Sequence, residues 1–248
     1  MTAITCVILA KDEEKNIGEC MGSVKWCDEI VVIDDDSSDK TTKIARRVGA
    51  KVVKRGLKGN FAAQRNFGLR QAKGEWVLFV DADERVGGDL KREVEEVIES
   101  SGGKVGFYVR RMDVMWGRKL KYGETGKVRL LRLAKRGAGK WTRRVDEVWK
   151  IKGEVGELKE PLLHLPHQSV SEFLKEVNFK SGLNAKQFLR GGKRVGWWEW
   201  GKPVGKFLYD WIWLGGFRDG MEGFNVALIM SFHSFLVRAK MKLEKGKP

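Results

Sequence analysis

Strand-like and helix-like patterns alternate through the N-terminal part of the chain. Short apolar runs flanked by polar residues predict buried strands, and the longer stretches between them predict helices. The predicted strands are Ile4–Ala10, Glu29–Ile33, Lys51–Lys54 and Trp76–Val80. The predicted helices open at Lys11–Asn16 and cover Gly59–Ala72 and about Asp89–Glu99. Strands that alternate with helices at this spacing predict an α/β fold with a parallel sheet wound in βαβ units.

The pattern changes after Val105. The runs Gly106–Val109, Val128–Leu133 and Val148–Ile151 predict strands of a mixed, more antiparallel part of the sheet. A helix is then predicted from about Ser169 to Arg190. We therefore expect an α/β domain over residues 1–168 and a helical region over residues 169–248, which a chain of 248 residues can accommodate.

The predicted helical region is rich in tryptophan and contains one uncharged stretch. Residues 224–237 carry no Asp, Glu, Lys or Arg, and basic residues follow immediately. This stretch is too short to span a bilayer, but flanking Trp and basic residues are typical of a helix that lies in a membrane surface. The alternatives are a helical subdomain that packs on the rest of the protein, or one that forms a homo-oligomer. Five tryptophans precede the stretch: Trp197, Trp198, Trp200, Trp211 and Trp213.

Composition narrows the partners and the compartment. The formal net charge of +15 indicates an anionic partner, which could be a nucleotide, a nucleic acid or a membrane surface. Three cysteines without a C-x-x-C motif favour a reduced cytoplasmic compartment over a disulfide framework. The N-terminus enters a strand directly, so no signal peptide is predicted.

Two carboxylates follow the central predicted strand. Asp81 and Asp83 are one residue apart, and residues i and i+2 of an extended chain point to the same side. Ligands of open α/β sheets bind at the carboxyl ends of the strands. Asp81 and Asp83 could therefore converge on Mg²⁺ or Mn²⁺, which prefer oxygen ligands. A D-x-D motif taken alone could equally be an acidic turn.

Further charged residues follow the other strands. The consecutive carboxylates of Asp34 and Asp35 repel each other and need a ligand or hydrogen-bond donors to compensate. Arg65, on a predicted helix, could reach a diphosphate. Asp146 and Glu147 form a second acidic pair, which could simply form a salt bridge with Arg143 or Arg144. His164 is a candidate ligand of a metal or a phosphate. No dinucleotide-binding or P-loop motif is present.

Together these motifs resemble those of the family 2 glycosyltransferases, which are inverting enzymes of the GT-A fold. The family's first strand ends in a segment similar to Leu9–Glu13, and its second in one similar to Asp34–Thr41. An A-x-x-R-N-x-G motif at Ala62–Gly68 precedes the D-x-D motif. Asp12, Asp36 and Asp146 stand where Asn, Gly and His are usual, and we expect Asp36 to alter the shape of the nucleotide loop.

The resemblance continues more faintly toward the lipopolysaccharide-core glucosyltransferase branch of the family. Val145–Glu147, His164 and the run Gly216–Gly220 are similar to segments of that branch. The resemblance implies a GT-A, Rossmann-like mixed sheet with a C-terminal helical appendage. It also implies that Asp146 or Glu147 is the catalytic base, and that Asp83, Asp81 and His164 bind Mg²⁺ or Mn²⁺. The nucleotide-sugar would contact Ala10, Glu13, Asp34, Asp35, Arg65, Asp81, Ala82 and Asp83.

These expectations define an inverting hexosyltransferase that uses a nucleotide-sugar, most simply a UDP-sugar. The acceptor would be a lipid-linked or cell-envelope glycan such as the lipopolysaccharide core, reached from the cytoplasmic face of an anionic membrane. One alternative is a polyprenyl-phosphate glycosyltransferase, although the transmembrane helices usual in that class are missing. A metal-dependent nucleotidyltransferase is an alternative of a different class, but its Gly-rich first loop is absent. Nucleic-acid binding is not expected, because acids at strand ends would repel phosphate.

Overall fold

The structure is a computed structural model that describes residues 3–166 and 169–243. The chain is divided into two compact units. The first contains the residues up to Arg111 and then Arg129–His164, and the second contains Met112–Val128 and the residues from Leu165 onward. The predicted boundary at residue 168 lies outside the described residues. The roles predicted for residues 1–168 and 169–248 stay predictions.

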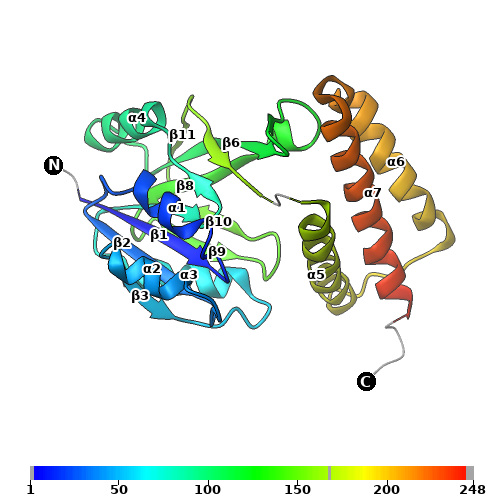
Figure 1. The fold of residues 1–248 in the computed structure, drawn as a ribbon, viewed down its shortest axis with the longest axis horizontal. Coiled ribbons are helices and arrows are strands. Elements are labelled where there is room, and N and C mark those ends of the chain that lie inside the picture. The colour runs from blue at the N-terminus through cyan, green and yellow to red at the C-terminus, as the bar shows by residue number, and fades with distance from the viewer. Residues whose placement is uncertain (1–2, 167–168, 244–248) are drawn as a thin grey trace. The chain divides into compact units, whose positions relative to one another are not determined.

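A mixed sheet forms the first unit (Figure 1). Its parallel part contains β3 (Lys51–Lys54), β2 (Glu29–Asp34), β1 (Ile4–Ala10) and β4 (Trp76–Asp81), in that spatial order. The sheet continues through the antiparallel strand β8 (Arg129–Lys135) to β6 (Gly106–Met115), β12 (Leu162–His164) and β5 (Glu84–Arg85). The short strand β11 (Val155–Glu157) pairs with β6, and β9 (Gly139–Thr142) pairs with β10 (Val148–Ile151) in a separate ribbon. The predicted mixed α/β sheet is confirmed.

Helices and the small ribbon cover the two faces of the sheet. One apolar cluster joins it to α1 (Ile17–Ser23), α2 (Thr41–Arg47) and α4 (Gly88–Glu99). A second cluster joins the opposite face to α3 (Phe61–Gln71) and to Trp141 and Trp149 of the ribbon. The sheet therefore lies between two apolar layers, and its carboxyl-terminal edge is left for polar residues.

Residues 11–16 differ from the prediction. The helix expected to open at Lys11–Asn16 begins only at Ile17, and Asp12 takes a positive φ of 52°. The acidic side chains here do not complement a helix dipole, because the main chain still forms a loop. The carboxylates of Asp12 and Glu14 accept hydrogen bonds from the N–H groups of Ser38 and Lys40, in the loop after β2, whereas that of Glu13 accepts from Asn16 Nδ2.

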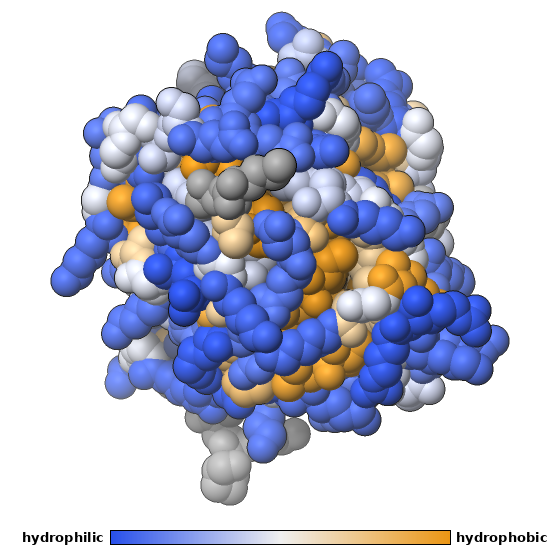
Figure 2. All heavy atoms as spheres, turned by 90° about the vertical axis from the view of Figure 1, so that its left-hand side faces the viewer, coloured by the Kyte–Doolittle hydropathy of each residue, from blue (hydrophilic) through white to orange (hydrophobic). Residues whose placement is uncertain are grey.

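Charge dominates the exposed surface. Figure 2 shows one face of the molecule, where hydrophilic residues surround a strip of hydrophobic ones. This distribution agrees with the high content of charged residues, 33%. The buried interior of the first unit is strongly apolar by contrast.

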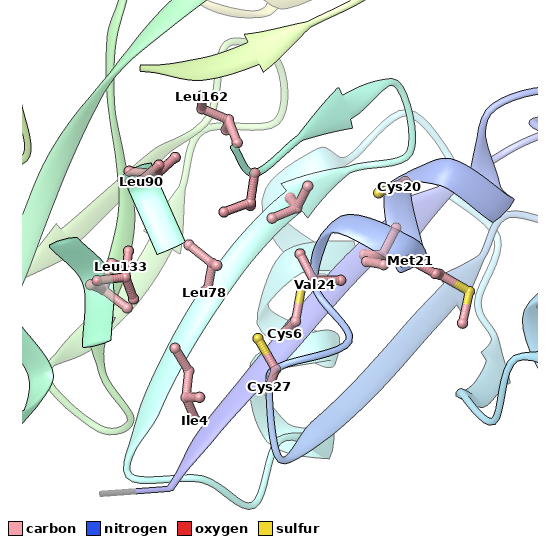
Figure 3. Close-up of a cluster of buried hydrophobic side chains, with 14 of the residues drawn as sticks. Ile4, Cys6, Cys20, Met21, Val24, Cys27, Leu78, Leu90, Leu133 and Leu162 are labelled. Atoms are coloured by element: carbon pink, nitrogen blue, oxygen red, sulfur yellow. The ribbon is translucent and has the colours of Figure 1, made fainter. Parts of the chain in front are cut away.

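The three cysteines belong to that interior. Cys6, Cys20 and Cys27 are buried free thiols, and Figure 3 shows them among Ile4, Val24 and Leu78. Burial raises the pKa of Cys20, which keeps this thiol protonated and unreactive. The cysteines of the described residues are therefore buried packing residues with free thiols.

The second unit is mainly helical. It contains α5 (Val170–Arg190), α6 (Lys202–Leu208) and α7 (Gly220–Leu243), and α7 packs against both other helices. Short helical turns η2 (Trp197–Gly201), η3 (Tyr209–Trp213) and η4 (Gly216–Asp219) connect α5, α6 and α7. The segment 112–128 contributes β7 (Arg118–Lys119) and the turn η1 (Thr125–Lys127). The predicted helix at Ser169–Arg190 is confirmed as α5.

Buried aspartates fasten segment 112–128 inside this unit. Asp219 is almost fully buried and accepts hydrogen bonds from the backbone N–H groups of Lys121 and Tyr122, at 3.0 and 2.8 Å. Asp210 accepts another from the N–H of Glu124. The Gly216–Gly220 run, which the sequence linked to a family branch, thus has a structural role.

Candidate active site

Two loops at the edge of the parallel sheet hold each other by reciprocal hydrogen bonds. The Asp12 carboxylate accepts from the N–H of Ser38 at 2.7 Å, and the N–H of Asp12 donates to Ser37 Oγ at 3.0 Å. The N–H of Glu13 donates to Thr41 Oγ1 at 2.7 Å. The loop after β1 and the loop after β2 therefore form one rigid unit, which explains much of the acidic and hydroxyl content of both motifs.

Asp36 keeps the backbone geometry that glycine would favour. Its φ is 53°, in the left-handed region, and its carbonyl accepts from Lys11 Nζ at 2.6 Å. Asp tolerates this region better than most residues, although it is less favourable there than Gly. The main chain at Asp36 thus takes a conformation that glycine also favours, with the side chain exposed, and the expected change in loop shape stays a prediction.

Asp34 and Asp35 have different environments. Asp34 is fully buried, and its carboxylate oxygens accept from the N–H of Ser37 at 3.3 Å. Asp35 is half-buried and accepts from the N–H of Leu57, while its own N–H donates to the buried Ala10 at 2.9 Å. Backbone donors therefore compensate the adjacent carboxylates, and Asp35 is the more exposed of the two.

Asp81, at the end of β4, is bracketed by two buried arginines. Arg65 Nη2 donates to Oδ1 of Asp81 at 2.9 Å, and Arg132 Nη2 donates to Oδ2 at 2.6 Å. Burial raises the pKa of Asp81, but the charges of Arg132 and Arg65 outweigh it and hold the pKa well below its usual range. Asp81 is therefore a fixed carboxylate whose oxygens are already engaged.

Arg132 was not identified from the sequence. It lies on β8 beside β4, and it also donates to Oε1 of the fully buried Glu84 at 3.1 Å. Oε2 of Glu84 in turn accepts from the N–H of Asp81 at 2.8 Å. A single arginine in a predicted strand gives no signal of this contact, because the β4–β8 pairing that creates it is nonlocal.

Each polar position of the A-x-x-R-N-x-G motif on α3 has a structural explanation. Asn66 bonds to both the N–H and the carbonyl of Trp141, at 2.9 and 2.8 Å. A Cβ atom at Gly68 would lie 2.6 Å from Val7 Cγ1, so only glycine lets α3 approach the sheet this closely. The motif fixes Arg65 against the sheet edge and against Trp141, whose ring lies 4.8 Å from the guanidinium carbon.

Glu147 joins this network, whereas Asp146 does not. Glu147 Oε1 accepts from Arg65 Nε at 2.6 Å, so its partner is Arg65 and not Arg143 or Arg144. Burial raises the pKa of Glu147, but Arg65 outweighs it and the pKa lies below its usual value. Asp146 is exposed and has a φ of 50°. The structure therefore brings only one member of the acidic pair to the D-x-D motif.

Asp83 and His164 meet directly. Strand β12 pairs with β5 so that His164 lies opposite Glu84, next to Asp83 in the chain. His164 Nε2 lies 3.2 Å from Asp83 Oδ2. Burial raises the pKa of Asp83, but His164 outweighs it, and the pKa lies below its ordinary value. Two residues far apart in sequence thus bring together one oxygen atom and one nitrogen atom that can each act as a metal ligand.

This donor pair fits a divalent ion. Two ligands about 2.1 Å from one ion and at right angles to each other lie about 3.0 Å apart, close to the observed separation. Asp81 is committed to its arginines, and within residues 3–166 and 169–243 no three His, Cys, Asp or Glu side chains form a metal cluster. The remaining ligands would come from outside the protein, as diphosphate oxygens and water could.

Glu13 and Ala82 lie at the same edge of the sheet. Ala82 is buried, and its N–H donates to the carbonyl of Leu9 at 3.2 Å, which places the D-x-D motif beside the first loop. Burial, with a smaller contribution from the charge of Asp83, raises the pKa of Glu13 to about 7. The edge of the sheet therefore concentrates carboxylates whose ionisation differs widely.

Known proteins share both the sequence pattern and the fold. Residues 5–143 match the glycosyl transferase family 2 pattern. The chain is 29% identical to the lipopolysaccharide core biosynthesis glycosyltransferase LpsC of Rhizobium meliloti (strain 1021), over 96% of this chain and 91% of that one. It is 26% identical to an uncharacterized glycosyltransferase of Rickettsia typhi (strain ATCC VR-144 / Wilmington), over 98% of this chain and 87% of that protein.

One solved structure shows how far the fold extends. Glucosyl-3-phosphoglycerate synthase from Mycobacterium tuberculosis, crystallised with Mn²⁺, uridine-diphosphate and phosphoglyceric acid, superposes with a TM-score of 0.53 at 14% identity. The match covers 79% of this chain and 80% of that one. At this identity the match supports the GT-A fold alone. Since the family pattern covers more than half of the chain, the protein belongs to glycosyl transferase family 2 and is a glycosyltransferase.

Proposed function

We propose that this glycosyltransferase transfers a sugar, with inversion at the anomeric carbon, from a UDP-sugar to a lipid-linked or cell-envelope glycan such as the lipopolysaccharide core. The observation that carries the proposal is the Asp83–His164 pair, 3.2 Å apart at the carboxyl end of the parallel strands. Ligands bind at this edge in open α/β sheets. The name of the Rhizobium relative supports the acceptor class, and uridine-diphosphate is the nucleotide crystallised with the mycobacterial enzyme that shares the fold.

The nucleotide-sugar would lie along the loops that follow β1 and β2, which are joined by hydrogen bonds. Asp35, with Asp34 buried behind it, and the Ala10–Glu13 segment would contact the uracil and the ribose. Arg65 and Arg132 have buried nitrogen atoms without a hydrogen-bond partner among the described residues. Such donors cost about 1–3 kcal/mol each while unsatisfied, so an anionic ligand or water that accepted from them would be favoured.

Asp83 and His164 would hold Mg²⁺ or Mn²⁺. Asp81 would remain ion-paired with Arg65 and Arg132, beside Ala82 and the sugar of the donor. A bound ion supplies Lewis-acid stabilisation of the leaving diphosphate. Arg65 and Arg132 keep Asp81 ionised and immobile, which orients the D-x-D backbone before the donor arrives. The protein's own contribution is therefore a preorganised acidic edge balanced by buried guanidinium groups.

Glu147 is the better placed candidate for the catalytic base. Arg65 orients it and lowers its pKa, so Glu147 is ionised and can accept the proton of the acceptor hydroxyl. Asp146 is exposed and would instead shape the turn that presents Glu147. Glu147→Gln keeps an acceptor for Arg65 and should bind donor normally but lose transfer, whereas Asp146→Asn should retain it. The reverse pattern would assign the base to Asp146.

A thermal-shift screen of UDP-, GDP- and dTDP-sugars with and without Mn²⁺ tests the donor. We expect a UDP-sugar to stabilise the protein only when Mn²⁺ is present. If no nucleotide-sugar stabilises it with metal, the proposed donor chemistry is wrong. Inversion is then tested by the anomeric configuration of the product.

The proposed localisation of the enzyme is the cytoplasmic face of a membrane. The +15 charge suits anionic headgroups, and residues 169–248 would form the peripheral membrane-associated region beside a catalytic domain over residues 1–168. Residues 216–243 form one helical stretch apolar enough to cross a bilayer by length and composition, which is weak evidence by itself. Attachment in the membrane surface agrees better with the packing of α7 against α5 and α6.

A further inference from the structure

We infer that the continuous helical segment 202–213, which contains α6 and η3, docks on an anionic lipid bilayer through its solvent-facing side. This inference makes the membrane attachment in the proposed function more specific. It rests on the proposed function only for the premise that the enzyme works at a bilayer. It assigns the contact to one side of one segment, and it excludes Trp211 from that contact.

One side of segment 202–213 is already used inside the second unit. Phe207 and Trp211 both contact Phe224 of α7, with ring centroids 5.6 and 5.3 Å apart. Pro203 and Asp210 on the same side are buried. Trp211, which the sequence grouped with lipid-facing tryptophans, is therefore half-buried and packs against Phe224 of this unit.

The opposite side is apolar as well, but it is exposed. Val204, Leu208 and Ile212 follow one another at a spacing of four residues, and Tyr209 and Trp213 extend the row. Val204 is 62% exposed, Ile212 58% and Trp213 80%. We call these five residues the apolar row. No Asp, Glu, Lys or Arg belongs to it.

A helix that is apolar on both sides is normally covered on both sides. Helix α7 packs on the interior side of segment 202–213. No described residue covers the apolar row. Contiguous exposed apolar residues of this kind mark an interaction surface. Trp and Tyr, which the row contains, are the residues that favour the headgroup level of a bilayer.

Charge selects a bilayer over a second copy of the chain. The second unit carries 18 Lys and Arg residues against 9 Asp and Glu residues. Two such units would repel each other, whereas phosphatidylglycerol or a similar anionic lipid would attract each one. Basic residues that flank an apolar row with Trp and Tyr are the composition of an in-plane membrane contact.

The test measures binding of the full-length protein to vesicles. Wild type should co-sediment with phosphatidylcholine–phosphatidylglycerol vesicles, and much less with pure phosphatidylcholine vesicles. The double variant Ile212→Ser/Trp213→Ser should bind the mixed vesicles at least about tenfold more weakly, because two exposed apolar side chains no longer enter the bilayer. The matched control Tyr108→Ser/Val155→Ser removes two exposed apolar side chains of the first unit and should bind as wild type does.

Three outcomes would overturn the inference: wild type that does not bind mixed vesicles, a double variant that binds them normally, or a control that loses binding equally. Light scattering in solution identifies a second copy as the occupant if the wild type dimerises, the double variant does not, and neither binds vesicles. Stabilisation by UDP-sugar and Mn²⁺ without vesicles serves as the folding control for the double variant. If vesicles bind but no nucleotide-sugar does, the docking surface stands and the proposed donor chemistry fails.

Discussion

Removing Arg132 should expose how strongly the buried ion network depends on it. In Arg132→Met, Glu84 keeps the N–H of Asp81 as a donor but loses its cationic partner while remaining fully buried. Asp81 keeps only Arg65. Methionine fills a similar volume without a charge, so the lost interaction is chiefly electrostatic.

The expected loss of unfolding free energy follows from this geometry. Removing one partner of a buried ion pair costs about 3–5 kcal/mol. Two nitrogen atoms of Arg132, Nε and Nη1, are buried without a partner among the described residues, and methionine removes these unsatisfied donors. We therefore expect the lower end of the range, about 3 kcal/mol. For a chain of this size that corresponds to a drop in Tm of about 6–12 °C.

Arg129→Met provides the matched control on the same strand. Arg129 pairs with Glu157 at 2.9 Å, but both side chains are exposed, so the loss should be about 0–1 kcal/mol. Urea unfolding followed by circular dichroism measures both variants. A loss in Arg132→Met no larger than in Arg129→Met would refute the reasoning, and Arg132→Met/Glu84→Gln should recover part of the loss.

Three further predictions concern single side chains. The pKa of Glu13 is raised to about 7 in the folded protein, so the free energy of unfolding should fall as the pH rises from about 4.5 to 7. In urea unfolding, Glu13→Gln should be more stable relative to wild type at pH 8 than at pH 5. An equal difference at the two pH values would contradict this. Asp219→Ala should lose about 2–4 kcal/mol, because two backbone N–H groups lose their acceptor, and a loss below 1 kcal/mol in the same assay would show that water replaces it. Asp36→Gly should gain up to about 1 kcal/mol, because the φ of 53° suits glycine, and a loss would mean that the side chain stabilises the loop.

Local patterns predicted the parallel half of the sheet well. The predicted strands Ile4–Ala10 and Lys51–Lys54 match β1 and β3, and the predicted helix Gly59–Ala72 contains α3. Apolar runs and flanking polar residues suffice there, because each buried strand carries its own signal. The start of α1 was predicted too early, since the positive φ of Asp12 and its bonds to the loop after β2 hold this segment in a non-helical conformation.

Nonlocal pairing limited what could be predicted for the site. Asp81, Asp83 and Arg65 stand in motifs with local signals, and the structure brings them to one edge. Arg132 reaches Asp81 only because β8 pairs with β4, and His164 reaches Asp83 only because the very short strands β12 and β5 pair. Strands of two or three residues have no periodicity to detect, so His164 was grouped with Asp83 only through the family resemblance. The roles of the site residues stay predictions.

The most direct test of the central claim is calorimetric binding of a UDP-sugar in the presence of Mn²⁺. The account predicts that wild type and the control Asp89→Asn, which changes an exposed acid on α4, bind the donor equally and only with metal. Asp83→Asn and His164→Gln should each lose most of the metal-dependent affinity. Unchanged metal-dependent binding in both Asp83→Asn and His164→Gln would contradict the assignment of this pair as the donor and metal site.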